Sequence, residues 1–168
     1  MGEIAIRRER PSDAAAVFAV ESAAFGRPDE ARIVDAIRGS ADELASLVAD
    51  DGGCIVGHVL FSRVRIVGAR ETPADVFAAA LGPVAVAPER QSHGIGGRLI
   101  RAGVENVRGR FATIFVLGNP RYYSRFGFEA ALPFGFTYAP GTERAFQMMQ
   151  LGGARPAGGR VVYHAAFG

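Results

Sequence analysis

The residues with the clearest chemical potential lie in the short glycine-containing segment Gln91–Gly97. The segment before it, Phe77–Val86, is apolar and uncharged, which predicts a buried strand that Pro88 terminates. From Gly94 the apolar residues follow helical spacing, so we expect a helix to begin within the glycines. The first backbone N–H groups of a helix lack partners inside it, and glycine lets an anion approach them closely. The segment is therefore either a phosphate-binding loop or simply a tight turn.

Two common nucleotide-binding loops do not fit this segment. The sequence contains no lysine, which excludes the glycine-rich loop that ends in lysine. The dinucleotide fingerprint would need a third glycine where Leu99 stands, so it fails as well. The pattern that remains is Gln91-x-x-Gly94-x-Gly96.

A second pattern follows downstream. Phe111–Leu117 is predicted to form a strand, and it precedes Tyr123-x-x-x-Gly127-Phe128 on what we expect to be a short helix. Together the two patterns resemble the GCN5-related N-acetyltransferase (GNAT) superfamily, in particular its small bacterial members. The resemblance covers the stretch from Leu44 to Phe128 and extends more loosely over the flanks.

The resemblance implies an α/β (α+β) fold with a mixed, mostly antiparallel sheet flanked by helices on both faces. The periodicity fits that arrangement, with about six or seven strands and the order strand, two helices, three strands, helix, strand, helix and two strands. We expect a single domain over residues 1–168, because no linker or internal repeat divides the chain.

The resemblance also implies that acetyl-coenzyme A (acetyl-CoA) is the co-substrate and that no metal is needed. The glycine loop would hold the pyrophosphate, and the strand before it would bulge and bond the pantetheine arm. Gly82-Pro83 favours such a bulge, although an ordinary strand starting at Pro83 is the alternative. The residues expected to contact the coenzyme are Val84, Ala85, Val86, Gln91, Ser92, Gly94, Ile95, Gly96, Gly97, Asn119 and Tyr122. Asn119 either bonds the pantetheine arm or caps the short helix before Pro120.

The chemistry implied is direct attack of a primary amine on the acetyl thioester in a ternary complex. Backbone N–H groups from Val84 to Val86 would stabilise the oxyanion, and Tyr123 occupies the family's general-acid position. Tyr122 is adjacent, but two neighbours on a helix point about 100° apart, so only one can face the thiol.

The sequence leaves the general base open among Glu21, Glu30, His58 and a water molecule. Glu21 lies in the apolar stripe of a helix, so it is either paired with an arginine, which we favour, or lines the acceptor pocket. His58 shares a strand face with apolar residues and is either a packing residue or a base. Glu30 lies in a first helical turn, where a carboxylate suits the helix dipole.

Two other functions fit the same patterns. The chain could be a catalytically inactive domain that binds and senses acyl-CoA, or it could transfer a longer acyl group. The acceptor is also open among small-molecule amines, amino acids, antibiotics, peptide N-termini and protein lysines. The apolar tail Val161–Phe167 suggests a homodimer.

Composition narrows the partners and the location. The net charge is +2 and the nineteen basic residues are scattered arginines, which argues against a nucleic-acid surface. We expect a cytoplasmic protein without membrane contact, because no signal peptide or membrane-length apolar run occurs. Cys54, the only cysteine, is expected to be buried in a strand. The arginines near the proposed site are Arg90, Arg98, Arg101 and Arg125, and some of them could meet phosphates.

Outside the two motifs, periodicity predicts the remaining elements. The expected strands are Glu3–Arg8, Leu44–Ala49, Cys54–Val67, Phe146–Leu151 and Val161–His164. A helix after Pro11 is expected to bury Ala14, Val17, Phe18 and Phe25, and a second helix runs from Pro28 to Gly39. The apolar segment Ala130–Gly141 is expected on the substrate side.

Overall fold

The computed structural model describes residues 3–68 and 76–168. The α-helices in this part of the chain are α1 (Ala14–Phe25), α2 (Asp29–Ile37), α3 (Ile95–Val107) and α4 (Pro120–Tyr123). The strands are β1 (Ala5–Arg8), β2 (Glu43–Asp51), β3 (Cys54–Gly68), β4 (Val76–Val86), β5 (Thr113–Leu117), β6 (Glu129–Ala130), β7 (Phe136–Thr137), β8 (Phe146–Gln150) and β9 (Gly159–Val162). None of the described helices is long and apolar enough to span a membrane.

Hydrogen bonds join the strands in the order β1-β2-β3-β4-β5-β8-β6, with β9 paired to both β3 and β7. The β4–β5 and β7–β9 pairs are parallel. The pairs β1–β2, β2–β3, β3–β9, β5–β8 and β6–β8 are antiparallel. The predicted mixed, mostly antiparallel sheet is confirmed. The two-residue strands β6 and β7 were not expected, because so short a segment carries no alternation to detect.

Two compact units make up the chain. The first comprises residues 1–62, 82–106 and 165–168, and the second comprises residues 63–81 and 107–164. The long strands β3 and β4 contribute to both units. Our expectation of a single domain stays a prediction.

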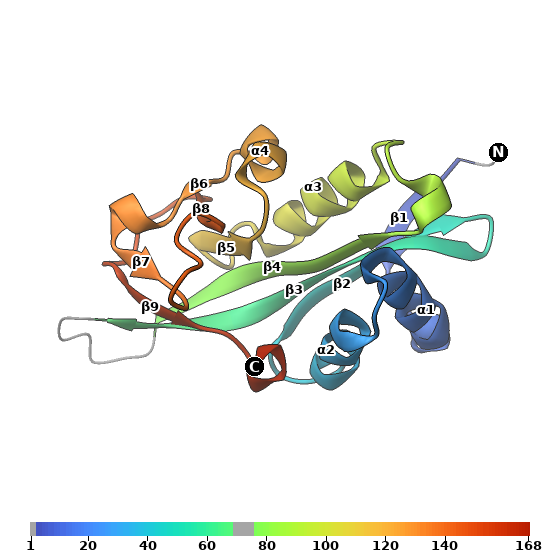
Figure 1. Ribbon diagram of the computed structural model, residues 1–168, viewed down its shortest axis with the longest axis horizontal. Coiled ribbons are helices and arrows are strands. Elements are labelled where there is room, and N and C mark those ends of the chain that lie inside the picture. Colours follow the sequence, from blue (N-terminus) through green and yellow to red (C-terminus); the bar gives the residue numbers. More distant parts are fainter. Residues whose placement is uncertain (1–2, 69–75) are drawn as a thin grey trace. The chain divides into compact units, whose positions relative to one another are not determined.

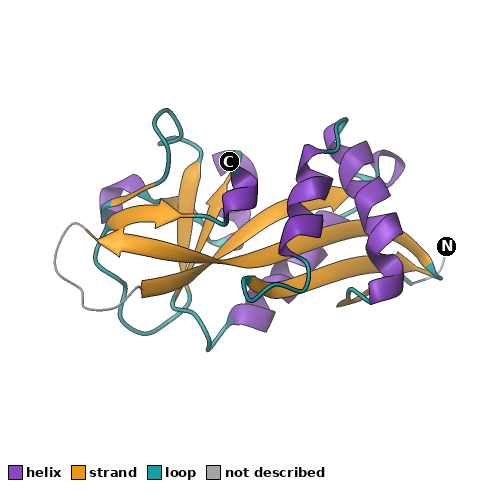
Figure 2. Ribbon diagram, turned by 90° about the horizontal axis from the view of Figure 1, so that it is seen from below, coloured by secondary structure: helices purple, strands orange, loops and turns teal. Residues whose placement is uncertain are grey.

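In the first unit, helices cover both faces of the strands. Helices α1 and α2 lie on one face and α3 lies on the other (Figure 1). Seen from below, α1 and α2 run across the strands that they cover (Figure 2). Their core joins Val17 and Val20 of α1 and Val34 of α2 to Leu60 of β3 and Ala85 of β4.

Small residues let α3 pack closely on the opposite face. A Cβ atom on Gly57 of β3 would lie 3.0 Å from Leu99 Cδ1 and 3.2 Å from Ile95 Cγ2 of α3. Further along the helix, a Cβ atom on Gly103 would overlap the ring of Phe61, coming within 2.6 Å of its Cζ atom. Since side chains alternate along β3, the neighbouring His58 and Leu60 face α1 and α2.

We expect Gly103→Ala to destabilise the protein by about 1–3 kcal/mol, because the added methyl group must displace the Phe61 ring in a closely packed core. This loss should outweigh the gain of up to about 1 kcal/mol in helix propensity. Urea unfolding measures the change. The double variant Gly103→Ala/Phe61→Leu should recover part of the loss, and an unchanged urea midpoint in the single variant would contradict the packing.

The second unit has its own aromatic core. Phe115 of β5 packs edge-on against Phe136, with ring centroids 5.0 Å apart, and stacks on Phe146 at 5.3 Å. Met148 of β8 and Val161 of β9 belong to the same cluster. In the first unit, Phe167 of the apolar tail packs against the core beneath α1 and α2. The homodimer that this tail suggested stays a prediction.

Two burial predictions were wrong. Cys54 is exposed, because it begins β3 directly after the tight turn at Gly52 and Gly53, whose φ angles of 61° and 97° are both positive. Phe25 is 42% exposed, because it is the last residue of α1 and lies one turn beyond the buried positions 17, 20 and 21.

Candidate functional site

The glycine loop has the geometry that its sequence predicts. A short 3-10 turn at Pro88–Arg90 follows β4, and α3 begins at Ile95. Gly94 has a φ angle of 79°, and Ser92 also adopts a positive φ of 63°, which is uncommon for a residue with a side chain. Such conformations gather at ligand-binding loops.

The start of α3 presents unpaired backbone donors. Its first helical hydrogen bond runs from Arg98 N to Gly94 O at 3.1 Å, so the N–H groups of Ile95, Gly96 and Gly97 have no acceptor within the helix. The Ile95 side chain is buried, and the two glycines are half-buried without side chains. This helix terminus can therefore bind an anion through backbone N–H groups and the helix dipole.

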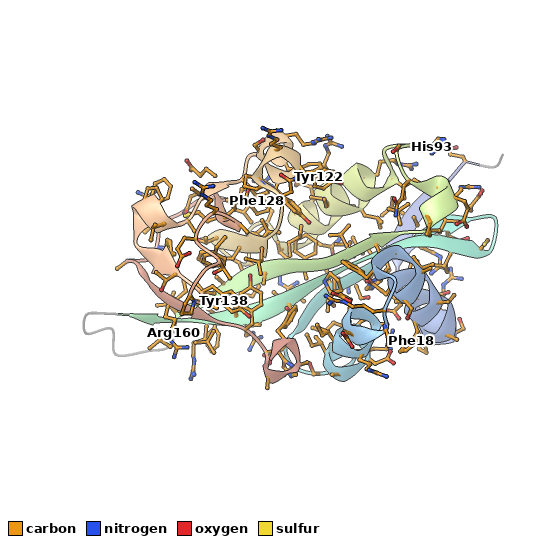
Figure 3. The ribbon with its side chains drawn as sticks, in the orientation of Figure 1. Phe18, His93, Tyr122, Phe128, Tyr138 and Arg160 are labelled. Carbon is orange, nitrogen blue, oxygen red and sulfur yellow. The ribbon has the colours of Figure 1, made fainter. Side chains whose placement is uncertain are left out.

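Side-chain hydrogen bonds hold the loop in shape. Gln91 Nε2 donates to the Val86 carbonyl at the end of β4, at 3.1 Å. His93 Nδ1 lies 2.6 Å from the Gln91 carbonyl in the exposed part of the loop (Figure 3). Arg90 pairs with Asp51, and Arg98 donates to the Ile4 carbonyl at 2.6 Å. Both arginines thus already have partners in the protein.

Strand β4 changes its pairing next to the loop. Its parallel pairing with β5 covers Ala79–Leu81, and the Gly82–Pro83 peptide bond just beyond that pairing is cis. Ala85 is buried in the core beneath α1 and α2, whereas Val84 and Val86 are half-buried. The contact of these residues with a pantetheine arm stays a prediction.

The second unit positions the two tyrosines. Gly118 N donates to the Ala145 carbonyl at 3.0 Å, and the Gly118 carbonyl accepts from Gln147 Nε2 at 3.1 Å. Asn119 Oδ1 accepts from Arg121 N at 3.0 Å, so Asn119 caps α4, as its alternative role predicts. Its cofactor role stays a prediction.

Tyr123 packs into this turn. Its ring lies against Gly118, where a Cβ atom would be 3.1 Å from Tyr123 Cδ2 and still closer to Cε2. The ring centroid is 5.0 Å from that of Tyr122 and 5.9 Å from that of Phe128 (Figure 3 labels these two neighbours). Burial raises the pKa of the Tyr123 hydroxyl to about 12, so the group keeps its proton at neutral pH. Arg125 lies over the Tyr122 ring, 4.7 Å from its centroid.

The structure brings together two of the candidate bases. Glu21 Oε1 lies 2.6 Å from His58 Nδ1, and both side chains are 0% exposed. The favoured pairing of Glu21 with an arginine was wrong, because β3 places His58 directly beneath α1. Glu30 is separate from this pair: Arg27 Nη2 lies 2.6 Å from its carboxylate and lowers its pKa.

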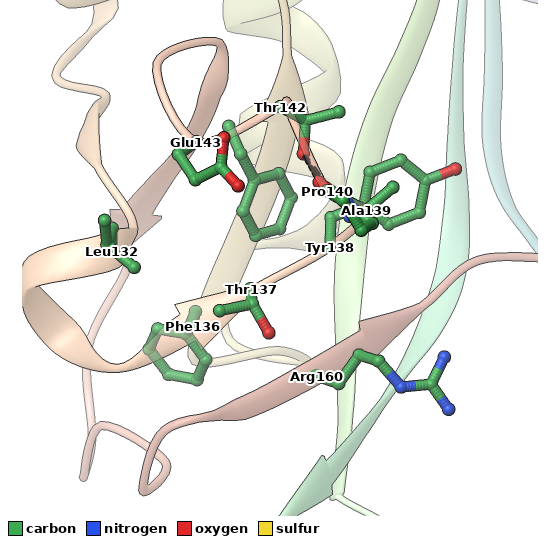
Figure 4. Close-up of a pocket in the computed structure, with 10 residues that line it drawn as sticks. Leu132, Phe136, Thr137, Tyr138, Ala139, Pro140, Thr142, Glu143 and Arg160 are labelled. Atoms are coloured by element: carbon green, nitrogen blue, oxygen red, sulfur yellow. Dashed lines mark hydrogen bonds between the residues drawn. The ribbon is translucent and has the colours of Figure 1, made fainter.

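A pocket of about 330 Å³ lies in the second unit (Figure 4). Its residues are Leu132, Phe136, Thr137, Tyr138, Ala139, Pro140, Thr142, Glu143, Phe146 and Arg160. Most of this lining is apolar or aromatic, and Glu143 adds a carboxylate whose pKa is lowered by backbone N–H groups, including that of Gly141. The segment expected on the substrate side thus lines a pocket suited to a small, largely apolar ligand.

Within the described ranges, no group of three or more His, Cys, Asp or Glu side chains could hold a metal ion. The family model described as "Acetyltransferase (GNAT) domain" matches residues 5–131. The chain belongs to the GNAT acetyltransferase family.

Two curated GNAT relatives from Escherichia coli K12 are themselves uncharacterised N-acetyltransferases. YjhQ is 44% identical over 121 residues, which cover 70% of this chain and 65% of YjhQ. The aligned region is thus slightly less than two thirds of that relative. YhbS is 34% identical over 167 residues, covering 96% of this chain and 97% of YhbS.

Two solved GNAT structures contain the coenzyme. A family member from Brucella melitensis in complex with acetyl-CoA is 40% identical with a TM-score of 0.81, and the match covers both chains fully. YhbS from E. coli in complex with CoA is 32% identical with a TM-score of 0.88, covering 99% of this chain and 93% of that chain.

Some polar residues in the cores of this GNAT chain were missed by sequence reasoning. Ser46 and Gln147 are 5% and 2% exposed within the mostly buried strands β2 and β8, and Glu9 has a 5% exposed side chain beyond β1. An isolated polar residue in a strand that reads as buried is the signal that could have identified Ser46 and Gln147.

Proposed function

We propose that the chain transfers the acetyl group of acetyl-CoA to a primary amine. The observation that carries this proposal is the start of α3, where three backbone N–H groups behind the left-handed Gly94 have no acceptor within the helix. A pyrophosphate has the charge and the acceptors that such a helix terminus requires. The coenzyme complexes of the two related structures support the same choice of co-substrate.

The proposed reaction needs one nucleophile, an oxyanion site and two proton transfers. The amine nitrogen bonds to the thioester carbon, and backbone N–H groups from Val84 to Val86 receive the charge on the oxygen. When the intermediate collapses, the C–S bond breaks and the departing thiolate takes a proton from the Tyr123 hydroxyl. The nitrogen loses its own proton to a base, which leaves a neutral amide.

The alternatives are an inactive sensor of acyl-CoA and a transferase of a longer acyl group. Tyr123 supports an active enzyme, because hydrogen bonds hold the turn that carries it and its hydroxyl remains protonated at neutral pH. The acceptor would be a small-molecule or peptide amine. The pocket in the second unit supports an acceptor with a small apolar part and an ammonium group that Glu143 attracts.

Thermal melts with acetyl-CoA, CoA, ATP and NAD in parallel test the proposal. A ligand present at a hundred times its Kd stabilises the fold by about 2.7 kcal/mol, which for this size raises Tm by roughly 5–10 °C. We expect that shift with acetyl-CoA and CoA alone, followed by thiol release when amines are added. No shift at saturating acetyl-CoA would contradict the function. A shift without thiol release across an amine panel would favour the sensor.

A further inference from the structure

Gln147 is a buried amide that bonds to the turn carrying Tyr123. Its Nε2 donates to the Gly118 carbonyl at 3.1 Å and to the Ala145 carbonyl at 3.2 Å. Gln147 is 2% exposed, and its cross-strand partner on β5 is Val116, an apolar residue that is also buried. A primary amide is costly to bury unless its N–H groups find acceptors. Here the acceptors are supplied by two backbone carbonyl groups outside the strand ladder.

Gly118 is held from β8 through both of its backbone groups. Its N–H donates to the Ala145 carbonyl at 3.0 Å, and its carbonyl accepts from Gln147. Gly118 directly follows Leu117, the last residue of β5, and precedes the helix α4. Removing the Gln147 amide would therefore release the Gly118 carbonyl from β8 at the point where the chain turns toward Tyr123.

The Tyr123 ring takes its position from Gly118. A Cβ atom on Gly118 would lie 3.1 Å from Tyr123 Cδ2 and still closer to Cε2, so the ring occupies the space that a side chain would fill. No described residue forms a hydrogen bond with the Tyr123 hydroxyl. Helix α4 has only four residues, and so short a helix is not stable by itself. The packing of the ring therefore determines where the hydroxyl lies.

Only one of the two adjacent tyrosines packs on Gly118. The rings of Tyr122 and Tyr123 are nearly perpendicular, with an angle of 87° between their planes. Tyr122 packs against Phe126, with ring centroids 5.4 Å apart, and Arg125 lies over its face. Gly118 thus receives Tyr123, the tyrosine that we propose as the general acid.

We propose that Gln147 is a positioning residue for the acid step: by holding Gly118, it holds the Tyr123 hydroxyl within reach of the departing thiolate. A general acid must lie within about 2.6–3.2 Å of the atom that it protonates. A displacement of about 1 Å can lower a rate about a hundredfold. This inference rests on the proposed function, because the position of the hydroxyl matters for turnover only if Tyr123 donates the proton.

Gln147→Met removes the amide and keeps an unbranched side chain, and Gln150→Met is its matched control. Gln150 lies at the other end of β8, and its Nε2 also donates to two carbonyl groups, those of Gly152 and Gly153. The probe is the primary amine that releases most thiol with the wild-type protein. We expect Gln147→Met to lower kcat at least about tenfold and to keep the Kd for CoA within about twofold, whereas Gln150→Met should keep both within about twofold.

The dependence on the Tyr123 hydroxyl separates positioning from a general loss of stability. In a Tyr123→Phe background, Gln147→Met should change kcat by less than about twofold, because the residue that it positions no longer has a proton to donate. An equal loss of kcat with and without the hydroxyl would overturn the proposal. A Gln147→Met protein with the same kcat as Gln150→Met would overturn it as well.

Gly118→Ala tests the same contact if Gln147→Met does not fold. Gly118 has no positive φ angle, so alanine fits the backbone, but its methyl group would overlap the Tyr123 ring. We expect kcat to fall at least about tenfold while Gln147 stays in place. A wild-type kcat in Gly118→Ala would show that the contact does not set the position of the hydroxyl.

Proton NMR measures the contact without any acceptor. The ring current of Tyr123 should shift the signals of the Gly118 Cα protons, and Tyr123→Leu identifies this contribution. Gln147→Met should reduce the shift and Gln150→Met should not, so an unchanged shift in Gln147→Met would overturn the proposal. A wild-type protein with no melt shift on acetyl-CoA would instead overturn the proposed function, and the Gly118 signals would still show whether Gln147 holds the ring.

Discussion

Replacing Tyr123 with Phe is expected to lower kcat about a hundredfold or more while leaving the Kd for CoA within about twofold of wild type. The change removes only the hydroxyl that we propose as the proton donor to the departing thiolate, and general-acid catalysis contributes a factor of at least this size. The ring itself remains, so its packing against Gly118 and Phe128 is preserved. Thiol release measures kcat, and calorimetry or a thermal melt measures the binding of CoA.

The pH dependence gives a second test of the same residue. An ordinary tyrosine loses its proton near pH 10, but burial raises the pKa of Tyr123 to about 12. A donor with this raised pKa stays protonated through pH 10, so kcat should show no fall below that pH from the loss of the acid. Tyr163→Phe is the matched control, because it removes another buried tyrosine hydroxyl in the second unit. Equal kcat values for Tyr123→Phe and the wild-type protein would remove Tyr123 from the mechanism.

The elements could be predicted where a single local cause determines them. Helical spacing that begins at Gly94 correctly located the start of α3, and the apolar segment before it corresponds to β4. The Gly52–Gly53 turn has an equally local cause, because two consecutive glycines allow the positive φ angles of a tight hairpin. These features depend only on residues that are close in the sequence, so they can be predicted from the sequence alone.

The partner of Glu21 could not be predicted, because it depends on which residues the sheet brings beneath α1. Periodicity showed that Glu21 faces inward, and it showed that His58 lies on a buried face. Glu21 and His58 are 37 positions apart, and no local pattern predicts that they meet. The partner expected for a buried carboxylate is an arginine. Ser46 can reach His58 because the register of β2 and β3 places Ser46 opposite Leu60 and Val48 opposite His58.

The turn that carries Tyr122 and Tyr123 also depends on both local and distant residues. The cap of α4 by Asn119 was a local possibility that the structure shows. The contacts of Gly118 with Ala145 and Gln147 join segments that are 27 to 29 residues apart, and they fix the orientation of the turn that carries Tyr123. A buried glutamine amide can satisfy two carbonyl groups at once, as Gln147 does with Gly118 and Ala145.

Replacing Gly96 with Glu is expected to weaken CoA binding by roughly a hundredfold, which corresponds to about 2.8 kcal/mol at 25 °C. The carboxylate would lie in the first turn of α3, where it competes with the pyrophosphate for the N–H groups and repels its charge. The stability of the ligand-free protein should not decrease, because glutamate has a higher helix propensity than glycine and a negative charge is favourable at this end of the helix. The thermal melt with CoA measures binding, and the melt without ligand measures the fold.

Ala19→Glu is the matched control for this charge change, because Ala19 is an exposed residue of α1 in the same unit. It adds the same side chain to a helix and should leave the CoA melt shift unchanged. The decisive pattern is a Gly96→Glu protein that melts at or above the wild-type temperature without ligand and no longer responds to CoA. If its CoA shift equalled that of Ala19→Glu, the N–H groups at the start of α3 would not contact the pyrophosphate, and the glycine loop would be a structural turn.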